Sequence, residues 1–147
     1  MTTPPPSVAL DDQLCFALYT ASRAMTARYR PMLDEMGLTY PQLLVLMALW
    51  EQDDQTVRQL GDRLDLDSGT MSPMLKRLSA IGVVTRERDP HDERSVRIRL
   101  TDAGRALEIS ACSLSEMMIG VLGMDVQQFA QLKQQLELIT ERVGRPS

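Results

Sequence analysis

The chain has 147 residues, the length of one domain, and its 44% apolar and 24% charged residues are typical of a globular protein with a buried core. One His and two Cys, Cys15 and Cys112, are too few for a four-ligand zinc site or a disulfide scaffold, so we expect no metal or cofactor. The sequence shows neither the pattern of a signal peptide nor an apolar run of about 18 residues. These features predict a cytoplasmic protein with reduced thiols and no membrane role.

The charge is unevenly distributed along the chain. The formal net charge of −4 argues against a nucleic-acid partner, because phosphate neutralisation needs Lys and Arg. Residues 68–99, however, hold seven basic and four acidic side chains, a local excess of three positive charges, which leaves −7 on the remainder. A basic middle segment in an otherwise acidic chain is compatible with a surface that faces phosphate.

The first predicted helix follows a Pro-rich tail over residues 1–9, which we expect to be disordered. Asp11 or Asp12 can accept the free N–H groups of a first turn that begins near Gln13. Apolar residues then recur every three to four positions, and Gly37 can end the helix in the left-handed conformation.

A second helix is expected to begin at Thr39, with Pro41 in its first turn. Its predicted apolar face consists of Leu44, Leu46, Met47 and Trp50.

Two shorter helices, Thr56 to Leu64 and Gly69 to Ile81, are joined by the tight link 65-DLDS-68 and form a helix-turn-helix pattern. The second of them is predicted to start behind Ser68 and to carry Pro73 in its opening turns. Its predicted buried residues are Met71, Met74, Leu75 and Leu78, and its predicted exposed residues are Thr70, Ser72, Lys76 and Arg77. Small hydrogen-bonding groups and cations on one face suit a helix that enters a DNA groove.

Two strands and two long helices are predicted for the remainder. Residues 83–89 and 95–101 alternate apolar and polar side chains across a turn-rich, charged loop. Helices are expected over 102–122, with Thr101 as N-cap, and over 125–143. The last helix carries an apolar stripe formed by Val126, Phe129, Leu132, Leu136, Ile139 and Val143. Such a stripe needs a partner, and a subunit interface is at least as good an interpretation as monomer core.

Cys15 falls in the first turn of the first helix, where unpaired N–H groups and the helix dipole stabilise a thiolate. Tyr19 lies one turn on, and its side chain points back toward the N-terminus. Tyr29 shares this face but lies about 21 Å from Cys15 along a straight helix, so only a second, antiparallel subunit could bring it to the thiol. The residues alone leave open a buried, inert Cys15 and tyrosines that serve only in packing.

The helix-turn-helix followed by a two-stranded wing resembles the MarR family of dimeric winged-helix regulators, most closely at 87-ERDPHDERSVRIRLTDAGR-105. The segments 13-QLCFALYTASRAMTARYRPMLDEMGLTYPQ-42 and 67-DSGTMSPMLKRL-78 resemble one branch, the organic hydroperoxide resistance regulators. Leu43 departs from this pattern, since relatives often carry Tyr there, and we expect it to change the polarity of the sensor pocket.

The resemblance implies a fold that is mainly α with a small antiparallel β wing, in a single integrated domain. Residues 10–38 would form a sensor and dimerisation helix, 39–101 the winged helix-turn-helix lobe, and 102–147 the C-terminal dimerisation helices.

The resemblance also implies roles at the DNA end. The 69–81 helix would enter the major groove, and the 89–95 loop would reach the minor groove through Arg94, whose guanidinium Asp92 can hold in place. A solvated ion pair is the alternative for these two residues. Phosphate contacts are expected from Lys76, Arg77 and Arg86, and phosphate or base-edge contacts from Ser68, Thr70 and Ser72. A two-fold dimer would bind a near-palindromic operator with half-sites about 34–36 Å apart.

At the sensor end, the resemblance implies that Tyr19, Tyr29 and Tyr40 surround the thiolate of Cys15. Phenols that donate to sulfur favour the thiolate without placing a cation there, which leaves the pocket apolar enough for an organic hydroperoxide. Cys15 would become a sulfenic acid, and Cys112 is the candidate resolving thiol, with a small thiol as the alternative. We expect a repressor that then releases its operator, and not an enzyme.

Two other functions stay open. One is a repressor of the same fold that a small aromatic ligand releases, with Cys15 inert. The other is a thiol peroxidase, which is the weaker alternative because the chain has no C-x-x-C motif.

Overall fold

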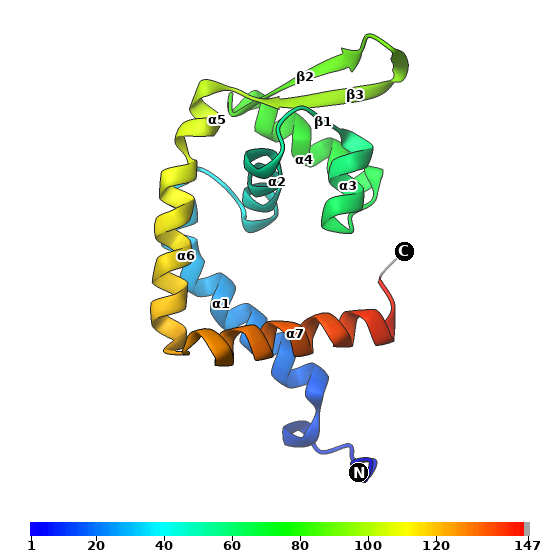
Figure 1. The fold of residues 1–147 in the computed structure, drawn as a ribbon, viewed down its shortest axis with the longest axis vertical. Helices are drawn as coiled ribbons and strands as arrows, with labels where there is room; N and C mark the ends of the chain where they lie inside the picture. Colours follow the sequence, from blue (N-terminus) through cyan, green and yellow to red (C-terminus); the bar gives the residue numbers. More distant parts are fainter. Residues whose placement is uncertain (146–147) are drawn as a thin grey trace.

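The computed structural model describes residues 1–145, and these form a mainly helical chain with one small antiparallel sheet (Figure 1). The sheet and helices α2 to α4 form one lobe, α1 and α6 extend away from it, and α7 runs back below it, so that Arg145 pairs with Asp65 of the lobe at 2.8 Å. The predicted fold class is therefore confirmed. In chain order the elements are η1 (Leu10–Asp12), α1 (Leu14–Met36), α2 (Tyr40–Glu51), β1 (Gln55–Thr56), α3 (Val57–Leu64), α4 (Ser68–Ala80), β2 (Val84–Asp89), β3 (Asp92–Leu100), α5 (Asp102–Ala106), α6 (Glu108–Leu122) and α7 (Val126–Val143).

The start of α1 differs from the prediction. Asp11 and Asp12 belong to the short 3-10 helix η1, and the Asp12 carboxylate accepts a hydrogen bond from the Ser7 hydroxyl at 2.6 Å. The N-cap of α1 is Gln13, and its side chain makes no capping hydrogen bond. The Gln13 amide donates instead to the carbonyls of Ser7 and Ala9. No side chain therefore caps the helix turn that carries Cys15.

The link between α1 and α2 follows the prediction. Gly37 adopts the left-handed conformation with φ 70° and donates its N–H to Asp34 and Leu33 carbonyls. Thr39 caps α2 by accepting the N–H of Gln42, whose side chain accepts the N–H of Thr39 in return.

Helix α2 is buried around most of its circumference, not along one apolar face. Leu43, Val45, Leu46 and Leu49 are all fully buried. Leu43 lies in the hydrophobic core, against which Tyr29 and Tyr40 also pack, so its effect on the polarity of the sensor pocket stays a prediction.

The helix-turn-helix consists of α3 and α4. The predicted burial of Met71, Met74, Leu75 and Leu78 is confirmed. The cap of α4 is Asp67 and not Ser68: the Asp67 carboxylate accepts the Thr70 N–H at 2.8 Å, so the helix begins one residue earlier than predicted. An ionised cap is also favoured by the positive end of the helix dipole.

The sheet has the strand order β1-β3-β2, and both pairs are antiparallel. Strands β2 and β3 form the predicted wing, with β3 beginning at Asp92. Strand β1 was not predicted, because two residues are too few to show alternation. Gln55 pairs with Ile98 and Thr56 with Arg97, so β1 ties the base of the wing to the start of α3.

The single helix predicted over 102–122 is interrupted at Leu107, between α5 and α6. The carbonyl of Gly104 would accept the N–H of residue 108 in an uninterrupted helix. In this structure it accepts the indole N–H of Trp50 at 3.1 Å. A contact with a residue 54 positions away thus coincides with the break.

The buried core lies in the lobe formed by α2 to α4 and the sheet, together with Leu33 of α1 and Ala111 and Leu114 of α6. Helix α7 has no buried residue, and α1 has only Leu33. In the described part of the chain no single helix is long and apolar enough to cross a membrane. Only Asp102–Leu122 and α7 taken together, at a bend of 100°, reach that length and composition.

Candidate functional site

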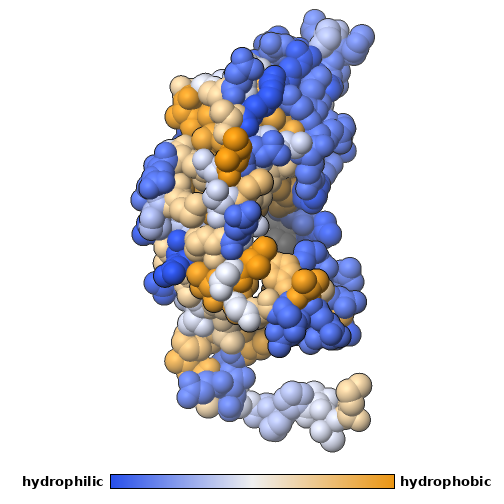
Figure 2. Space-filling model, turned by 60° about the vertical axis from the view of Figure 1, so that its left-hand side comes forward, coloured by the Kyte–Doolittle hydropathy of each residue, from blue (hydrophilic) through white to orange (hydrophobic). Residues whose placement is uncertain are grey.

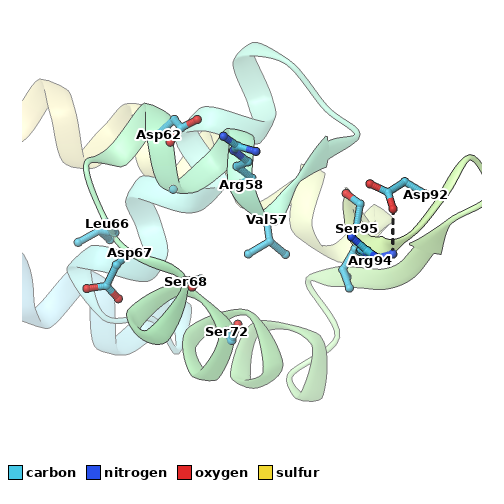
Figure 3. A pocket seen from close by; sticks show the side chains of 12 residues that line it. Val57, Arg58, Asp62, Leu66, Asp67, Ser68, Ser72, Asp92, Arg94 and Ser95 are labelled. Atoms are coloured by element: carbon cyan, nitrogen blue, oxygen red, sulfur yellow. Dashed lines mark hydrogen bonds between the residues drawn. The ribbon is translucent and has the colours of Figure 1, made fainter. Parts of the chain in front are cut away.

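A hollow of about 710 Å³ separates α3, the start of α4 and the wing. Figure 3 shows Arg58 and Asp62 on α3, Ser68 and Ser72 on α4, and Arg94 on the wing around this space. Four of the predicted DNA-contacting residues line it: Ser68, Ser72, Asp92 and Arg94. The fold therefore brings the predicted reading helix and the predicted wing tip to the two sides of one hydrophilic groove.

The other predicted DNA contacts do not line this groove. Thr70 and Lys76 are exposed on α4, and Arg86 is exposed on β2. Arg77 lies in the last turn of α4 and lines a second, shallower hollow beside the α1–α2 link, together with Asp34 and Thr39. Arg58 was not predicted, because a single cation on a short helix carries no pattern, yet its side chain lines the groove.

The predicted contact between Asp92 and the Arg94 guanidinium is wrong. The Asp92 carboxylate accepts the backbone N–H of Arg94 at 3.0 Å (Figure 3), and among the described residues the two side chains form no ion pair. An Asp side chain satisfies the N–H two residues on more readily than it reaches a long, solvated side chain. Asp92 therefore shapes the turn, and the Arg94 guanidinium stays available for a partner.

Two of the seven cations in the basic segment are neutralised within the fold. Arg97 donates to Asp54 at 2.7 Å and to Asp89 at 3.2 Å, and Arg99 contacts Asp54 at 3.1 Å. The hydrogen bonds from Arg97 and then Arg99 hold the pKa of Asp54 below its ordinary value. The backbone N–H of His91 and the Arg97 side chain lower the pKa of Asp89. Counting charges along the sequence thus overestimates the cations that can face phosphate.

Cys15 is the second residue of α1, and its thiol is exposed and unpaired. Tyr19, one turn further along, is also exposed, with 59% of its surface accessible. The first turn of α1 has no side-chain cap, so its N–H groups and the positive end of the helix dipole remain available to an anion at this position.

Tyr29 and Tyr40 lie together at the other end of α1. Their rings are stacked, with centroids 5.3 Å apart and planes 7° from parallel. Burial, and secondarily the charge that Tyr40 would carry, raises the pKa of Tyr29 and keeps its phenol protonated. Fourteen residues of helix, about 21 Å, separate Tyr29 from Cys15 of the same chain.

Cys112 is also free and exposed. Cys112 lies near the start of α6, which contacts α1, and Figure 1 shows this part of α6 beside the end of α1 that leads into α2. Cys15 precedes Leu33 by eighteen residues, or about 27 Å of helix. The two cysteines of one chain therefore lie at opposite ends of α1. Within residues 1–145 no group of three or more His, Cys, Asp and Glu side chains could hold a metal ion.

Large apolar side chains remain exposed on the helices outside the core lobe. They include Leu14 and Phe16 of α1, Ile109 and Ile119 of α6, and Phe129, Leu132 and Leu136 of α7. Figure 2 turns the α6 side forward and shows apolar residues spread over this helical part, whereas the wing at the upper end is hydrophilic.

A helix-turn-helix, a charged two-stranded wing and separate apolar helices together define a winged-helix transcriptional regulator. The family model of the transcriptional regulator SarA/Rot matches residues 27–108. The chain is 45% identical to the organic hydroperoxide resistance transcriptional regulator of Bacillus subtilis over 132 residues, which cover 90% of each chain. It belongs to the MarR family of regulators, in the organic hydroperoxide resistance branch.

Solved structures agree with this assignment. The structure of reduced AbfR bound to DNA matches with a TM-score of 0.77 and 37% identity, over 91% of this chain and 94% of that one. The disulfide-formed AbfR matches with a TM-score of 0.66 and 38% identity, over 91% and 89% of the two chains. AbfR comes from Staphylococcus epidermidis.

Proposed function

We propose that this protein is a homodimeric DNA-binding repressor that senses organic hydroperoxides through Cys15 and releases its operator when that thiol is oxidised. The observation that carries the proposal is the separation of an exposed thiol at one end of α1 from a stacked tyrosine pair at the other end. Two antiparallel copies of α1 would bring each thiol to the other subunit's tyrosine pair.

The exposed apolar surface supports the dimer. Helix α7 has no buried residue although it carries an apolar stripe, and the exposed apolar residues of α1 and α6 extend this uncovered surface. Monomeric proteins rarely expose apolar surface of this extent, and a symmetric pair of chains is the commonest way to cover it.

The groove between α4 and the wing supports operator binding. Helix α4 presents Ser68, Thr70, Ser72 and Lys76 to solvent or to the groove, and Arg94 stands at the wing across the hollow. In a two-fold dimer the two α4 helices would read half-sites about 34–36 Å apart, so the operator is a near-palindrome. Reduced AbfR, a relative with the same fold, has been captured on DNA.

The sensing step uses the Cys15 thiolate as a nucleophile. Its sulfur attacks the distal oxygen of the hydroperoxide, an S–O bond forms and the O–O bond breaks. Sulfur is oxidised by two electrons, the peroxide is reduced, and the alkoxide takes up a proton and leaves as the alcohol. Phenols rather than cations at the thiol keep the surroundings suited to alkyl hydroperoxides.

Resolution of the sulfenic acid by Cys112 of the other subunit completes the proposal. The Cys112 thiol displaces water from sulfur, and a disulfide forms. Within one chain the two thiols lie at opposite ends of α1, whereas an antiparallel partner would place its Cys112 near Cys15. A disulfide requires Cα atoms within about 7 Å, so if the resting distance is greater, its formation moves the helices and rotates the DNA-reading lobes. The thiol reacts once per signal without turnover, which distinguishes the protein from an enzyme.

The test measures DNA binding by fluorescence anisotropy, on an operator selected from random DNA, with and without cumene hydroperoxide. We expect release for wild type, no release for Cys15→Ser, and an intersubunit disulfide on non-reducing gels that is absent from Cys112→Ser. Wild-type DNA binding that is unchanged by cumene hydroperoxide would contradict the proposal. Release of Cys15→Ser by an aromatic acid would indicate a ligand-operated repressor, and many turnovers with dithiothreitol would indicate a peroxidase.

A further inference from the structure

Arg23 is the nearest cation to the sensor cysteine along α1. Its guanidinium carbon lies 5.4 Å from the centre of the Tyr19 ring. Cys15, Tyr19 and Arg23 are spaced four residues apart, so they lie above one another on a single face of α1. Side chains on a helix lean toward its N-terminus. Arg23 therefore leans over Tyr19, and Tyr19 lies one turn from Cys15, although within residues 1–145 its hydroxyl makes no hydrogen bond to the thiol.

The guanidinium has no competing carboxylate. Among the described residues Arg23 takes part in no ion pair, and the side chains one turn away on α1 are Tyr19, Thr20, Thr26 and Ala27. The ring face of Tyr19 is thus the contact that the structure gives this cation.

A cation on the face of a phenol has two effects on its hydroxyl. It restricts the ring to one orientation, and it withdraws electron density, which makes the O–H a stronger hydrogen-bond donor. A stronger donor near a sulfur anion stabilises that anion. The cation itself stays beyond the ring, so it does not add a charge to the surface that the hydroperoxide approaches.

We propose that Arg23 is a positioning residue of the sensor, which acts through Tyr19 to orient its hydroxyl so that it can donate a hydrogen bond to the Cys15 thiolate. This inference rests on the proposed function, because it concerns the thiolate that reacts with hydroperoxide. It adds a residue that carries no thiol or phenol and that the sequence pattern did not single out.

The test compares wild type with Arg23→Met, which keeps the aliphatic stem and removes the charge. We measure the rate of Cys15 alkylation by iodoacetamide and of oxidation by cumene hydroperoxide as a function of pH, with the Cys15 peptide quantified by mass spectrometry. Arg23→Met should react about two- to fivefold more slowly near neutral pH, a factor that matches an exposed cation–π contact. Arg23→Lys should recover part of the loss.

A second pair of variants separates this role from a general effect on α1. Tyr19→Phe keeps the ring but has no hydroxyl, so Arg23→Met should change the rate little in that background. The inference would be overturned if Arg23→Met slowed the reaction of Cys15 equally in wild type and in Tyr19→Phe. It would also be overturned if Cys15 of Arg23→Met reacted as fast as in wild type. A wild-type Cys15 no more reactive than free cysteine would instead contradict the proposed function, so the two failures are distinguishable.

Discussion

Tyr29 and Tyr40 belong to different helices, yet their rings stack with centroids 5.3 Å apart and planes 7° from parallel. The stack fixes two phenol hydroxyls in one place before any partner arrives. The ordinary pKa of a tyrosine, 10.0, already lies above physiological pH and burial raises the pKa of Tyr29 further, so its hydroxyl remains a donor. A preformed pair of donors is suited to receiving an anionic sulfur from another subunit.

Removal of one hydroxyl without loss of the ring tests this role. Tyr29→Phe preserves the stack, so the dimer and its DNA affinity should be unchanged. Oxidation of Cys15 should slow by about ten- to hundredfold, because a hydrogen bond to a charged group contributes about 1.5–3 kcal/mol. Stopped-flow kinetics with cumene hydroperoxide measure this rate. A Tyr29→Phe protein that oxidises as fast as wild type would show that the phenol does not touch the thiolate.

The salt dependence of operator binding tests the groove. Arg94→Ala and Lys76→Ala should each weaken binding and reduce the slope of log affinity against log salt by about one. Lys133→Ala removes the same charge from the middle of α7, a helix that contributes no residue to the groove, and is the matched control. An Arg94→Ala slope equal to that of Lys133→Ala would remove the wing from the interface.

Gly104 provides a test of the joint between the wing and α5, the short helix that precedes α6. A Cβ at this position would lie 2.1 Å from the Val83 carbonyl oxygen, so Gly104→Ala should destabilise the fold by about 1–3 kcal/mol. A Cβ at Gly120 meets nothing within 4 Å. Gly120→Ala should therefore raise the free energy of unfolding by about 0.5–1 kcal/mol, because Ala has the higher helix propensity. Urea unfolding measures both. Equal effects of the two substitutions would show that α5 does not pack this closely on Val83.

The ion network at the base of the wing predicts a dependence of stability on acid. The pKa values of Asp54 and Asp89 are lowered in the folded state. The two carboxylates therefore contribute fully to the free energy of unfolding at pH values above their ordinary pKa of 3.8. This contribution is lost as the pH falls through their lower pKa values in the folded state. Arg97→Gln removes the shared partner, so its stability should fall less steeply below about pH 4. Thermal unfolding across a pH series measures how stability depends on pH in wild type and in Arg97→Gln. The same pH dependence in both proteins would contradict the network.

Local signals in the sequence were sufficient for most of the fold. Thr39 and Pro41 predict the start of α2 because helix capping involves only neighbouring residues. The break at Leu107 could not be predicted, since residues 102–122 read as one helix and the bond that accompanies the break comes from Trp50 of α2. Strand β1 was missed for a similar reason: only its pairing with Ile98 and Arg97 makes Gln55 and Thr56 a strand.

The candidate site likewise combines positions that the sequence predicts with contacts that only the folded structure reveals. The positions of Ser68, Ser72 and Arg94 on one groove follow from the order of helix, turn and wing. The partners of charged side chains do not follow from order, because Arg97 finds Asp54 across 43 positions. Likewise, the spacing of Tyr29 and Cys15 excludes a contact within one chain but gives no sign that Tyr29 stacks on Tyr40.

The claim that each sensor is shared by two chains can be tested with a mixed dimer of differently tagged subunits. One subunit carries Cys15→Ser with Tyr29 intact, and the other carries Tyr29→Phe with Cys15 intact. If the site is shared, the remaining thiol faces an intact Tyr29, and it should be oxidised by cumene hydroperoxide at the wild-type rate per thiol. If that thiol is oxidised as slowly as in the Tyr29→Phe homodimer, each chain uses its own tyrosine and the account is wrong.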